Sequence, residues 1–271
     1  MNRLTNLQAR ILTAAVIGPV AIGAAWVGLI TWTILVCVTV GAAAREWLRL
    51  VIGPDHGLAP CLALAVGLGT LTIVAASQAL PVLALVTGLA AALIGGLVGW
   101  RVSAPRLSAF CLGLVYLGAP AVALVWLHRQ PEIGLALIVW TLVVVWATDI
   151  GAYAVGRSVG GPKLWPAVSP RKTWAGFIGG LLFGTAAGLC VRYAAQSDLP
   201  AALIIIAPLV SAAAQAGDLL ESAIKRRRGV KDTGGLLPGH GGVLDRLDGL
   251  FVAAPVFAAI LAIVGDDLTW P

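Results

Sequence analysis

The chain has 271 residues, of which 59% are hydrophobic and only 11% are charged, and its formal net charge is +6. A water-soluble domain typically carries about 45–50% apolar and about 25% charged residues, so this composition excludes an ordinary soluble protein. In a membrane protein an excess of Lys and Arg chiefly reports topology, so the positive charge does not indicate a nucleic-acid partner. We therefore predict an integral membrane protein.

Apolar stretches near the ~20 residues that an α-helix needs to cross hydrocarbon follow one another along the chain. They predict an all-α, polytopic helical bundle of about nine transmembrane helices, at residues 11–28, 29–44, 59–78, 80–99, 107–127, 132–154, 175–195, 199–222 and 247–266. A membrane β-barrel would alternate apolar and polar residues strictly, and these runs do not. We treat 1–271 as a single membrane domain, in which 1–130 hold the N-terminal helices and 131–271 hold the later helices and the long polar connectors.

The predicted spans divide the cationic residues unevenly between the two sides of the membrane. With a cytoplasmic N-terminus, all of the 18 Lys and Arg residues except Arg129 and Arg192 fall on the cytoplasmic side. This is the bias of the positive-inside rule, and it supports both the number of spans and their orientation. We expect a multi-pass protein of a bacterial plasma (inner) membrane, with its polar connectors, and any active site they form, facing the cytoplasm.

Carboxylates occur late in two of the predicted spans. Ionisable residues at membrane depth are costly and usually functional, which draws attention to Asp149 and Asp218. Helical spacing of i, i+3, i+4 and i+7 places four polar side chains on one face, namely Asp218, Glu221, Ser222 and Lys225. The alternative is an Asp–Lys pair that only holds two helices together.

Two polar connectors flank these carboxylates. The first, residues 156–173, mixes Gly, Pro, hydroxyls and cations, as a loop that meets phosphate oxygens should. The second, residues 225–248, alternates cations, carboxylates and glycines. Carboxylates such as Asp218, Asp245 and Asp248 are hard ligands, and Mg²⁺ typically binds one or two of them together with substrate phosphates. The residues therefore predict metal-assisted phosphate chemistry at the cytoplasmic face.

The stretch from Ser222 to Asp248 resembles the signature of the phosphatidate cytidylyltransferases, also called CDP-diacylglycerol synthases. Its matching positions include Lys225, Arg226, Lys231, Asp232, Gly234, Leu237, Pro238, His240, Gly241, Gly242, Asp245 and Arg246. The segments 149–157 and 169–173 look like the family's other recurring elements, so the resemblance covers about 145–250. One departure is Ala175-Gly176, where many members have Glu.

This resemblance implies transfer of CMP from CTP to phosphatidic acid, giving CDP-diacylglycerol and pyrophosphate. The implied catalytic set is Asp218, Asp245, Lys225 and Arg246. The implied substrate-binding set is Ser169, Arg171, Lys172, Thr173, Ser222, Arg226, Lys231, Asp232, His240, Gly241 and Gly242. Asp218 and Asp245 would bind Mg²⁺ or Mn²⁺, with Asp149 and Asp248 as additional candidates and K⁺ as a candidate monovalent cation. The implied partners are CTP, phosphatidic acid, the lipid bilayer and a second copy of the chain. Within the single domain, the resemblance assigns 1–130 to a scaffold and candidate dimer region and 131–271 to the catalytic helices and cytoplasmic loops.

Other classes of membrane protein fit the sequence less well. A CDP-alcohol phosphotransferase would share the Asp245-x-x-Asp248-Gly249 opening, but Val252-Ala253 stands where its motif needs Ala-Arg. A membrane transporter with intramembrane carboxylates is the alternative function, although its carboxylates should cluster near the midplane. A purely structural scaffold would have no use for so many polar groups in the last three spans.

Overall fold

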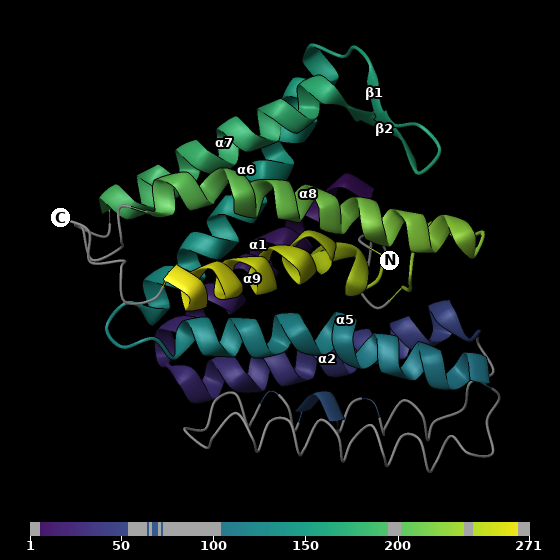
Figure 1. Ribbon diagram of the computed structural model, residues 1–271, viewed down its shortest axis with the longest axis horizontal. Coiled ribbons are helices and arrows are strands. Elements are labelled where there is room, and N and C mark those ends of the chain that lie inside the picture. The colour runs from purple at the N-terminus through teal and green to yellow at the C-terminus, as the bar shows by residue number, and fades with distance from the viewer. Residues whose placement is uncertain are drawn as a thin grey trace. The chain divides into compact units, whose positions relative to one another are not determined.

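A computed structural model describes residues 6–53, 64, 67–69, 72, 104–194, 202–235 and 241–264. Helices dominate these residues, and one short hairpin interrupts them (Figure 1). The helices are α1 (Asn6–Val27), α2 (Leu29–Val51), α5 (Ala104–His128), α6 (Gly134–Ser158), α7 (Trp174–Ala194), α8 (Leu203–Arg227) and α9 (Leu244–Val264). The predicted spans 59–78 and 80–99 lie outside the described residues, except for helical residues 64, 67–69 and 72.

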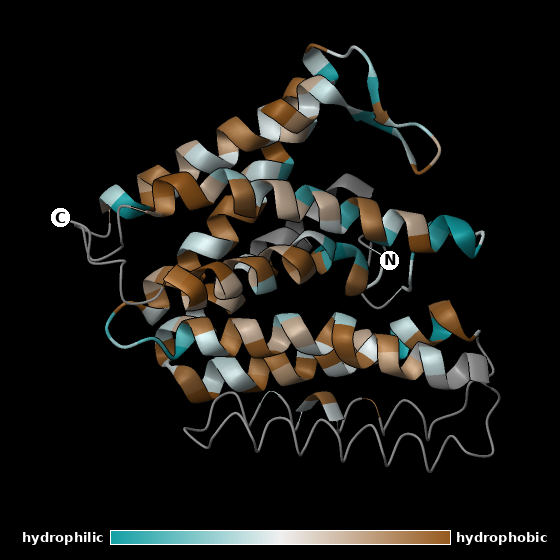
Figure 2. Ribbon diagram, viewed as in Figure 1, coloured by the Kyte–Doolittle hydropathy of each residue, from teal (hydrophilic) through white to brown (hydrophobic). Residues whose placement is uncertain are grey.

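Five of the described helices are long and apolar enough to cross a membrane. They are Phe110–His128, Gly134–Ser158, Trp174–Ala194, Leu203–Arg227 and Leu244–Val264, and a shorter apolar stretch covers Val16–Val27. Figure 2 shows apolar residues along these helices and hydrophilic residues at the hairpin and at the end of α8. The helical, multi-span character is thus confirmed, and the total of nine spans stays a prediction.

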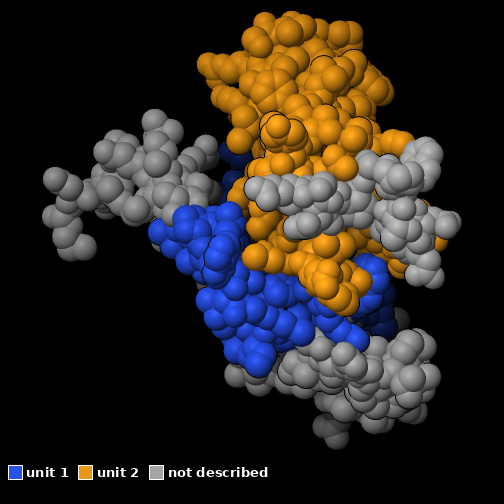
Figure 3. Space-filling view, turned by 90° about the vertical axis from the view of Figure 1, so that its left-hand side faces the viewer, with its two compact units in different colours: residues 1–129, 228–247 blue, residues 130–227, 248–271 orange. Residues whose placement is uncertain are grey.

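The chain forms two compact units (Figure 3). Unit 1 contains residues 1–129 and 228–247, and unit 2 contains residues 130–227 and 248–271. The segment 228–247 therefore belongs with the N-terminal helices, although about a hundred residues separate it from them along the chain. Asp245 falls in unit 1, whereas Asp149, Asp218 and Asp248 fall in unit 2.

In unit 1, aromatic side chains fasten α2 to α5. The rings of Trp47 and Tyr116 pack with their centroids 5.1 Å apart. Gly113 makes room for Trp47, because a Cβ there would lie 2.6 Å from the indole Nε1. Farther along, Trp32 donates a hydrogen bond from Nε1 to the carbonyl oxygen of Leu124, at 3.1 Å. Because α2 is held at two levels, it forms a firm support for side chains near its C-terminus.

In unit 2, glycines let α6 and α7 approach closely. A Cβ on Gly179 would lie 2.5 Å from Val155 Cβ, and one on Gly176 would lie 2.8 Å from the carbonyl oxygen of Ala152. Small residues at helix contacts are characteristic of membrane bundles, where packing takes over from the hydrophobic effect. A hydrogen bond of 2.8 Å from Thr148 Oγ1 to Ser211 Oγ links α6 to α8. The three helices therefore form the frame that carries the polar residues of unit 2.

The first polar connector, interpreted above as a loop, is a β-hairpin. Strand β1 (Lys163–Trp165) pairs antiparallel with β2 (Ser169–Thr173), with Lys163 opposite Thr173. Gly160 and Gly161 precede it with φ of 68° and 92°, backbone angles that favour glycine. Short strands with few apolar residues are hard to recognise in a Gly- and Pro-rich segment. The consequence is that the cations of β2 stand on a paired strand.

Candidate active site

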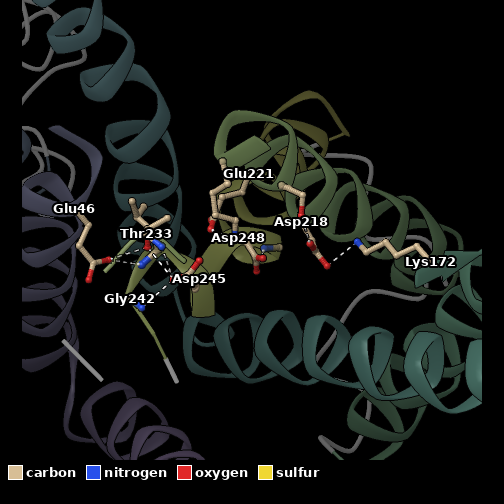
Figure 4. A network of polar contacts seen from close by, with 12 residues as sticks. Glu46, Lys172, Asp218, Glu221, Thr233, Gly242, Asp245 and Asp248 are labelled. Carbon is tan, nitrogen blue, oxygen red and sulfur yellow. Dashed lines mark hydrogen bonds and ion pairs between the residues drawn. The ribbon is translucent and has the colours of Figure 1, made fainter. Parts of the chain in front are cut away.

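An ion pair in unit 2 connects the hairpin with α8. Lys172 Nζ lies 2.6 Å from Asp218 Oδ2, and the two side chains are 25% and 34% exposed (Figure 4). Asp218 Oδ1 also accepts a hydrogen bond from Ser222 Oγ, one helical turn later, at 3.3 Å. Among the described residues, Asp218 is therefore held by the side chains of Lys172 and Ser222, at a partly solvated position. In this geometry the pair does join two elements, as the structural alternative required, but neither group is sealed from a ligand.

The polar face predicted for α8 is present. Besides the Asp218–Ser222 contact, Lys225 Nζ lies 3.0 Å from Glu221 Oε1. Glu221 is buried, whereas Lys225 keeps some exposure toward the end of the helix. The next residue, Arg226, is exposed. The stripe therefore leads from a buried carboxylate to cations in contact with solvent.

An open cavity of about 620 Å³ lies beside this ion pair within unit 2. Its charged lining comprises Asp149, Arg157, Arg171, Lys172 and Asp218. Uncharged residues complete the wall, among them Tyr153, Thr173, Phe177 and Gln215. Three cations and two carboxylates in one cavity suit an anionic ligand that carries or recruits a metal ion. Arg157 is a cation that sequence reasoning placed in a family element without giving it a role.

Asp248 adds a third acidic side chain to the same part of unit 2. The charges of Asp218, Glu221 and Asp149 act on this partly buried carboxylate. Its Oδ1 accepts a hydrogen bond from the backbone N–H of Gly249, at 2.8 Å. Gly217 permits this arrangement, because a Cβ there would collide with the carbonyl oxygen of Asp248. The negative charge gathered here is an electrostatic reason for a cation to bind.

The donor chemistry of unit 2 fits a divalent cation. Asp149 and Asp218 line one cavity, and Mg²⁺ usually binds one or two carboxylates while water and substrate phosphates supply the other ligands. In the described part of the chain, no group of three His, Cys, Asp or Glu side chains could hold a metal ion by itself. Two carboxylates that line one cavity suit a cation whose other ligands include a substrate phosphate.

Asp245, in unit 1, has very different surroundings. It is only 8% exposed, and its Oδ2 accepts hydrogen bonds from three donors. They are the backbone N–H of Thr233 at 2.9 Å, the hydroxyl of Thr233 at 2.9 Å and the backbone N–H of Gly242 at 2.8 Å (Figure 4). In the structure Asp245 thus organises the segment that precedes α9. Its role as a metal ligand stays a prediction.

Sequence reasoning missed a second buried carboxylate in unit 1. Glu46 is 3% exposed, and its Oε2 accepts a hydrogen bond from the backbone N–H of Leu244 at 3.0 Å. The predicted span ended at residue 44, but α2 continues to Val51 and carries Glu46 with it. Neighbouring Arg45 and Arg49 were counted only as topological signals. A lone carboxylate at the end of an apolar helix was the signal that could have revealed it.

The remaining predicted residues fall into three groups. Thr173 is buried and caps α7, because its Oγ1 accepts a hydrogen bond from the backbone N–H of Gly176 at 3.1 Å. Four exposed cations are open to an anion from solution, namely Arg171, Arg226, Lys231 and Arg246. Asp232 is also exposed, and Ser169 is partly buried. Gly241 and Gly242 lie next to Asp245, whereas His240 lies outside the described residues.

Comparisons with known proteins bear on the polar residues of unit 1 and of unit 2. The model of the cytidylyltransferase family matches residues 8–264. The phosphatidate cytidylyltransferase of Brucella suis is 40% identical over 265 residues, which cover 96% of each chain. The protein of that name from Bacillus subtilis is 40% identical over 153 residues, 56% of this chain and 57% of the relative. Because the family match runs from α1 to the end of α9 and includes every carboxylate described above, the chain belongs to the cytidylyltransferase family.

Proposed function

We propose that this chain is a phosphatidate cytidylyltransferase, which transfers CMP from CTP to phosphatidic acid in phospholipid biosynthesis. The observation that carries the proposal is the 40% identity, over 96% of the chain, with a protein of that name. The cavity of unit 2 supports it, because cations and carboxylates together suit the transfer of phosphoryl and nucleotidyl groups. The products would be CDP-diacylglycerol and pyrophosphate.

In the proposed reaction an oxygen of the lipid phosphate attacks the α-phosphorus of CTP. The bond between that phosphorus and the pyrophosphate oxygen breaks, so the nucleotide's two outer phosphates leave together. The attacking phosphate is already anionic at neutral pH, and therefore no protein nucleophile is required. The protein's task is to hold two polyanions close together and to stabilise the charge that moves onto the leaving group.

Cationic side chains would perform most of that task. We assign phosphate binding to Arg157, Arg171 and Lys172, which line the cavity of unit 2. Lys172 would exchange part of its contact with Asp218 for a phosphate oxygen when substrate enters. Further substrate contacts are proposed for Ser169, Thr173, Ser222, Lys225, Arg226, Lys231, Asp232, His240, Gly241, Gly242 and Arg246.

The proposed cofactor is Mg²⁺ or Mn²⁺, with K⁺ as a second candidate cation. Asp218 and Asp149 would hold the divalent cation, with Asp248 as a further ligand, and Asp245 is a candidate on the family resemblance alone. Bound there, the cation would supply positive charge to the pyrophosphate that departs. Asp245 would have to share an oxygen that already accepts three hydrogen bonds, so Asp218 is the better supported ligand.

We further propose nine spans, a cytoplasmic N-terminus and an active site on the cytoplasmic side of the plasma membrane. The support for this orientation is the concentration of Lys and Arg in one set of connectors, including the exposed cations at the end of α8. A homodimer is proposed on the family resemblance alone.

A direct assay tests the proposed function. Purified protein would be incubated with radiolabelled CTP, phosphatidic acid and Mg²⁺, beside samples with EDTA and with Asp245→Asn. We expect lipid-soluble label that disappears in both controls. No label with any divalent cation or phosphatidate species would overturn the proposal and favour the alternative, a membrane transporter with intramembrane carboxylates.

A further inference from the structure

The start of α9 is stabilised by a side chain from α2. The first N–H groups of a helix have no partner within the helix, and a carboxylate near them also interacts favourably with the helix dipole. Here the backbone N–H of Leu244, the first residue of α9, donates to Glu46 Oε2 at 3.0 Å. The two residues are 198 positions apart in the sequence. Glu46 therefore acts as a cap supplied by a distant helix.

The same oxygen of Glu46 also meets the residue that contacts Asp245. Thr233 Oγ1 lies 2.9 Å from Asp245 Oδ2 and 3.4 Å from Glu46 Oε2. A hydroxyl has a single hydrogen to donate, and the shorter contact with Asp245 is the better hydrogen bond. Thr233 thus stands between two buried carboxylates, and a continuous polar path leads from α2 through Thr233 to Asp245.

Two glycines leave the space that the Glu46 side chain occupies. A Cβ on Gly234 would lie 2.5 Å from Glu46 Oε1, and a Cβ on Gly242 would lie 2.5 Å from Glu46 Oε2. Both distances are too short for any real side chain. The carboxylate therefore fits between the two backbone segments that donate hydrogen bonds to Asp245, at residues 233–234 and at Gly242, and Figure 4 shows the second of these. This fit ties the position of the segment to the position of α2.

Burial of Glu46 is costly, which argues against an incidental contact. Its Oε1 is buried without a hydrogen-bond partner among the described residues. A buried polar atom left in this way typically costs about 1–3 kcal/mol. The neighbouring Trp47 is locked against Tyr116 and Gly113 of α5, so Glu46 stands on a helix that cannot easily turn away.

We propose that Glu46 is a positioning residue for the cytidylyl transfer proposed above, on which this inference rests. It sets the first turn of α9, and with it Asp245, from the support of α2. Glu46 need not touch CTP, phosphatidate or a metal ion to do so. Its substitution acts through the backbone of residues 241–245.

The test compares two substitutions of similar size in the full-length protein. Glu46→Met removes the acceptor oxygens, whereas Glu46→Gln keeps one oxygen that can accept from Leu244. The matched control is Glu132→Gln, because Glu132 is exposed and belongs neither to the Glu46–Asp245 contacts nor to the carboxylates around Asp218. Three quantities are measured for each variant: kcat, the KM for each substrate, and hydrogen–deuterium exchange of peptides that cover residues 241–248.

We expect Glu46→Met to lower kcat about 10- to 100-fold, as loss of a supporting residue typically does, with the KM for phosphatidate changed less than about twofold. Exchange at 241–248 should become faster. Glu46→Gln should restore kcat to within about threefold of wild type and restore slow exchange, and Glu132→Gln should match wild type. Wild-type kcat and exchange in Glu46→Met would overturn the proposal, as would a Gln variant no better than Met.

A shorter side chain provides a second test if Glu46→Met fails to fold. Glu46→Asp keeps the charge but withdraws the oxygen from Leu244, so faster exchange at 241–248 and a several-fold lower kcat are expected. Wild-type values of both would refute the positioning role. Inactive wild-type protein would count against the proposed function instead, while the exchange comparison would still report on whether Glu46 holds the start of α9.

Discussion

Asp218 and Asp245 carry the same sequence prediction but stand in opposite environments. Asp218, in unit 2, borders an open cavity and is held by the side chains of Lys172 and Ser222, which can rotate away. Asp245, in unit 1, is buried. Two of the three groups that donate to its Oδ2 are backbone N–H groups, which cannot rotate away as side chains can. The first arrangement allows partners to exchange during a reaction cycle. The second fixes the path of the chain, so the same residue type has exchangeable partners in one place and fixed partners in the other.

The largest expected effect is that of Asp245→Asn, which would remove both a proposed ligand and a buried charged acceptor. We expect the initial rate to fall about 10²–10³-fold, as when a key electrostatic group is lost. Hydrogen bonds to charged groups contribute about 1.5–3 kcal/mol each, so the thermal unfolding midpoint in detergent should also fall while the protein stays folded. An active Asp245→Asn variant with wild-type stability would show that Asp245 is neither a ligand nor a stabilising acceptor, and that it does not differ from Asp218 as described.

Asp218→Asn should separate activity from stability. We expect the rate to fall roughly 100-fold, because the substitution withdraws a proposed metal ligand from the cavity. Since the side chain is 34% exposed and its partners are other side chains, the unfolding midpoint should stay close to that of wild type. Calorimetry beside the radiolabel assay checks both quantities. A large loss of stability would mean that the Lys172–Asp218 pair is chiefly structural.

Lys172→Met tests whether the cavity binds phosphate. We expect the KM for CTP or for phosphatidate to rise about tenfold, which corresponds to about 1.4 kcal/mol of lost binding. The control is Lys163→Met, because Lys163 is an exposed lysine of the same hairpin that does not line the cavity. Equal KM values in both variants and in wild type would remove the cavity from the proposed binding site.

The smallest expected effect concerns the frame of unit 2. A Cβ on Gly176 would lie 2.8 Å from the Ala152 carbonyl oxygen, so Gly176→Ala should force α6 and α7 apart. Overpacking of this kind typically costs about 1–3 kcal/mol, which thermal unfolding in detergent can detect. Gly23→Ala is the control, because nothing lies within 4 Å of its Cβ position. Equal stability of the two variants would show that this contact adapts freely.

The helical plan could be predicted because the bilayer imposes it. Long apolar runs can satisfy their backbone groups in hydrocarbon only as helices or closed barrels, and the described residues follow the first of these. The polar face of α8 was likewise predictable, because its contacts are local and depend on helical spacing alone. The pairing of Lys172 with Asp218 could not be predicted in the same way, because the hairpin that presents Lys172 has no strong sequence pattern.

The surroundings of Asp245 could not be predicted from spacing. Its partners lie in an irregular segment, and the charge that supports that segment comes from Glu46, 187 residues before Thr233. A single sequence carries no periodic signal for contacts of this range. Nothing in the structure explains why Ala175 stands where many family members have Glu.

The cap that α2 supplies to α9 has a consequence for how the protein is made. Glu46 leaves the ribosome long before its partner, because Leu244 follows it by 198 residues. At a synthesis rate of about 5–20 residues per second, roughly 10–40 s pass before the partner exists. During that interval Glu46 has no contact with the start of α9. A chain that ends before residue 244 never gains this contact, so a truncated product lacks the link between α2 and α9.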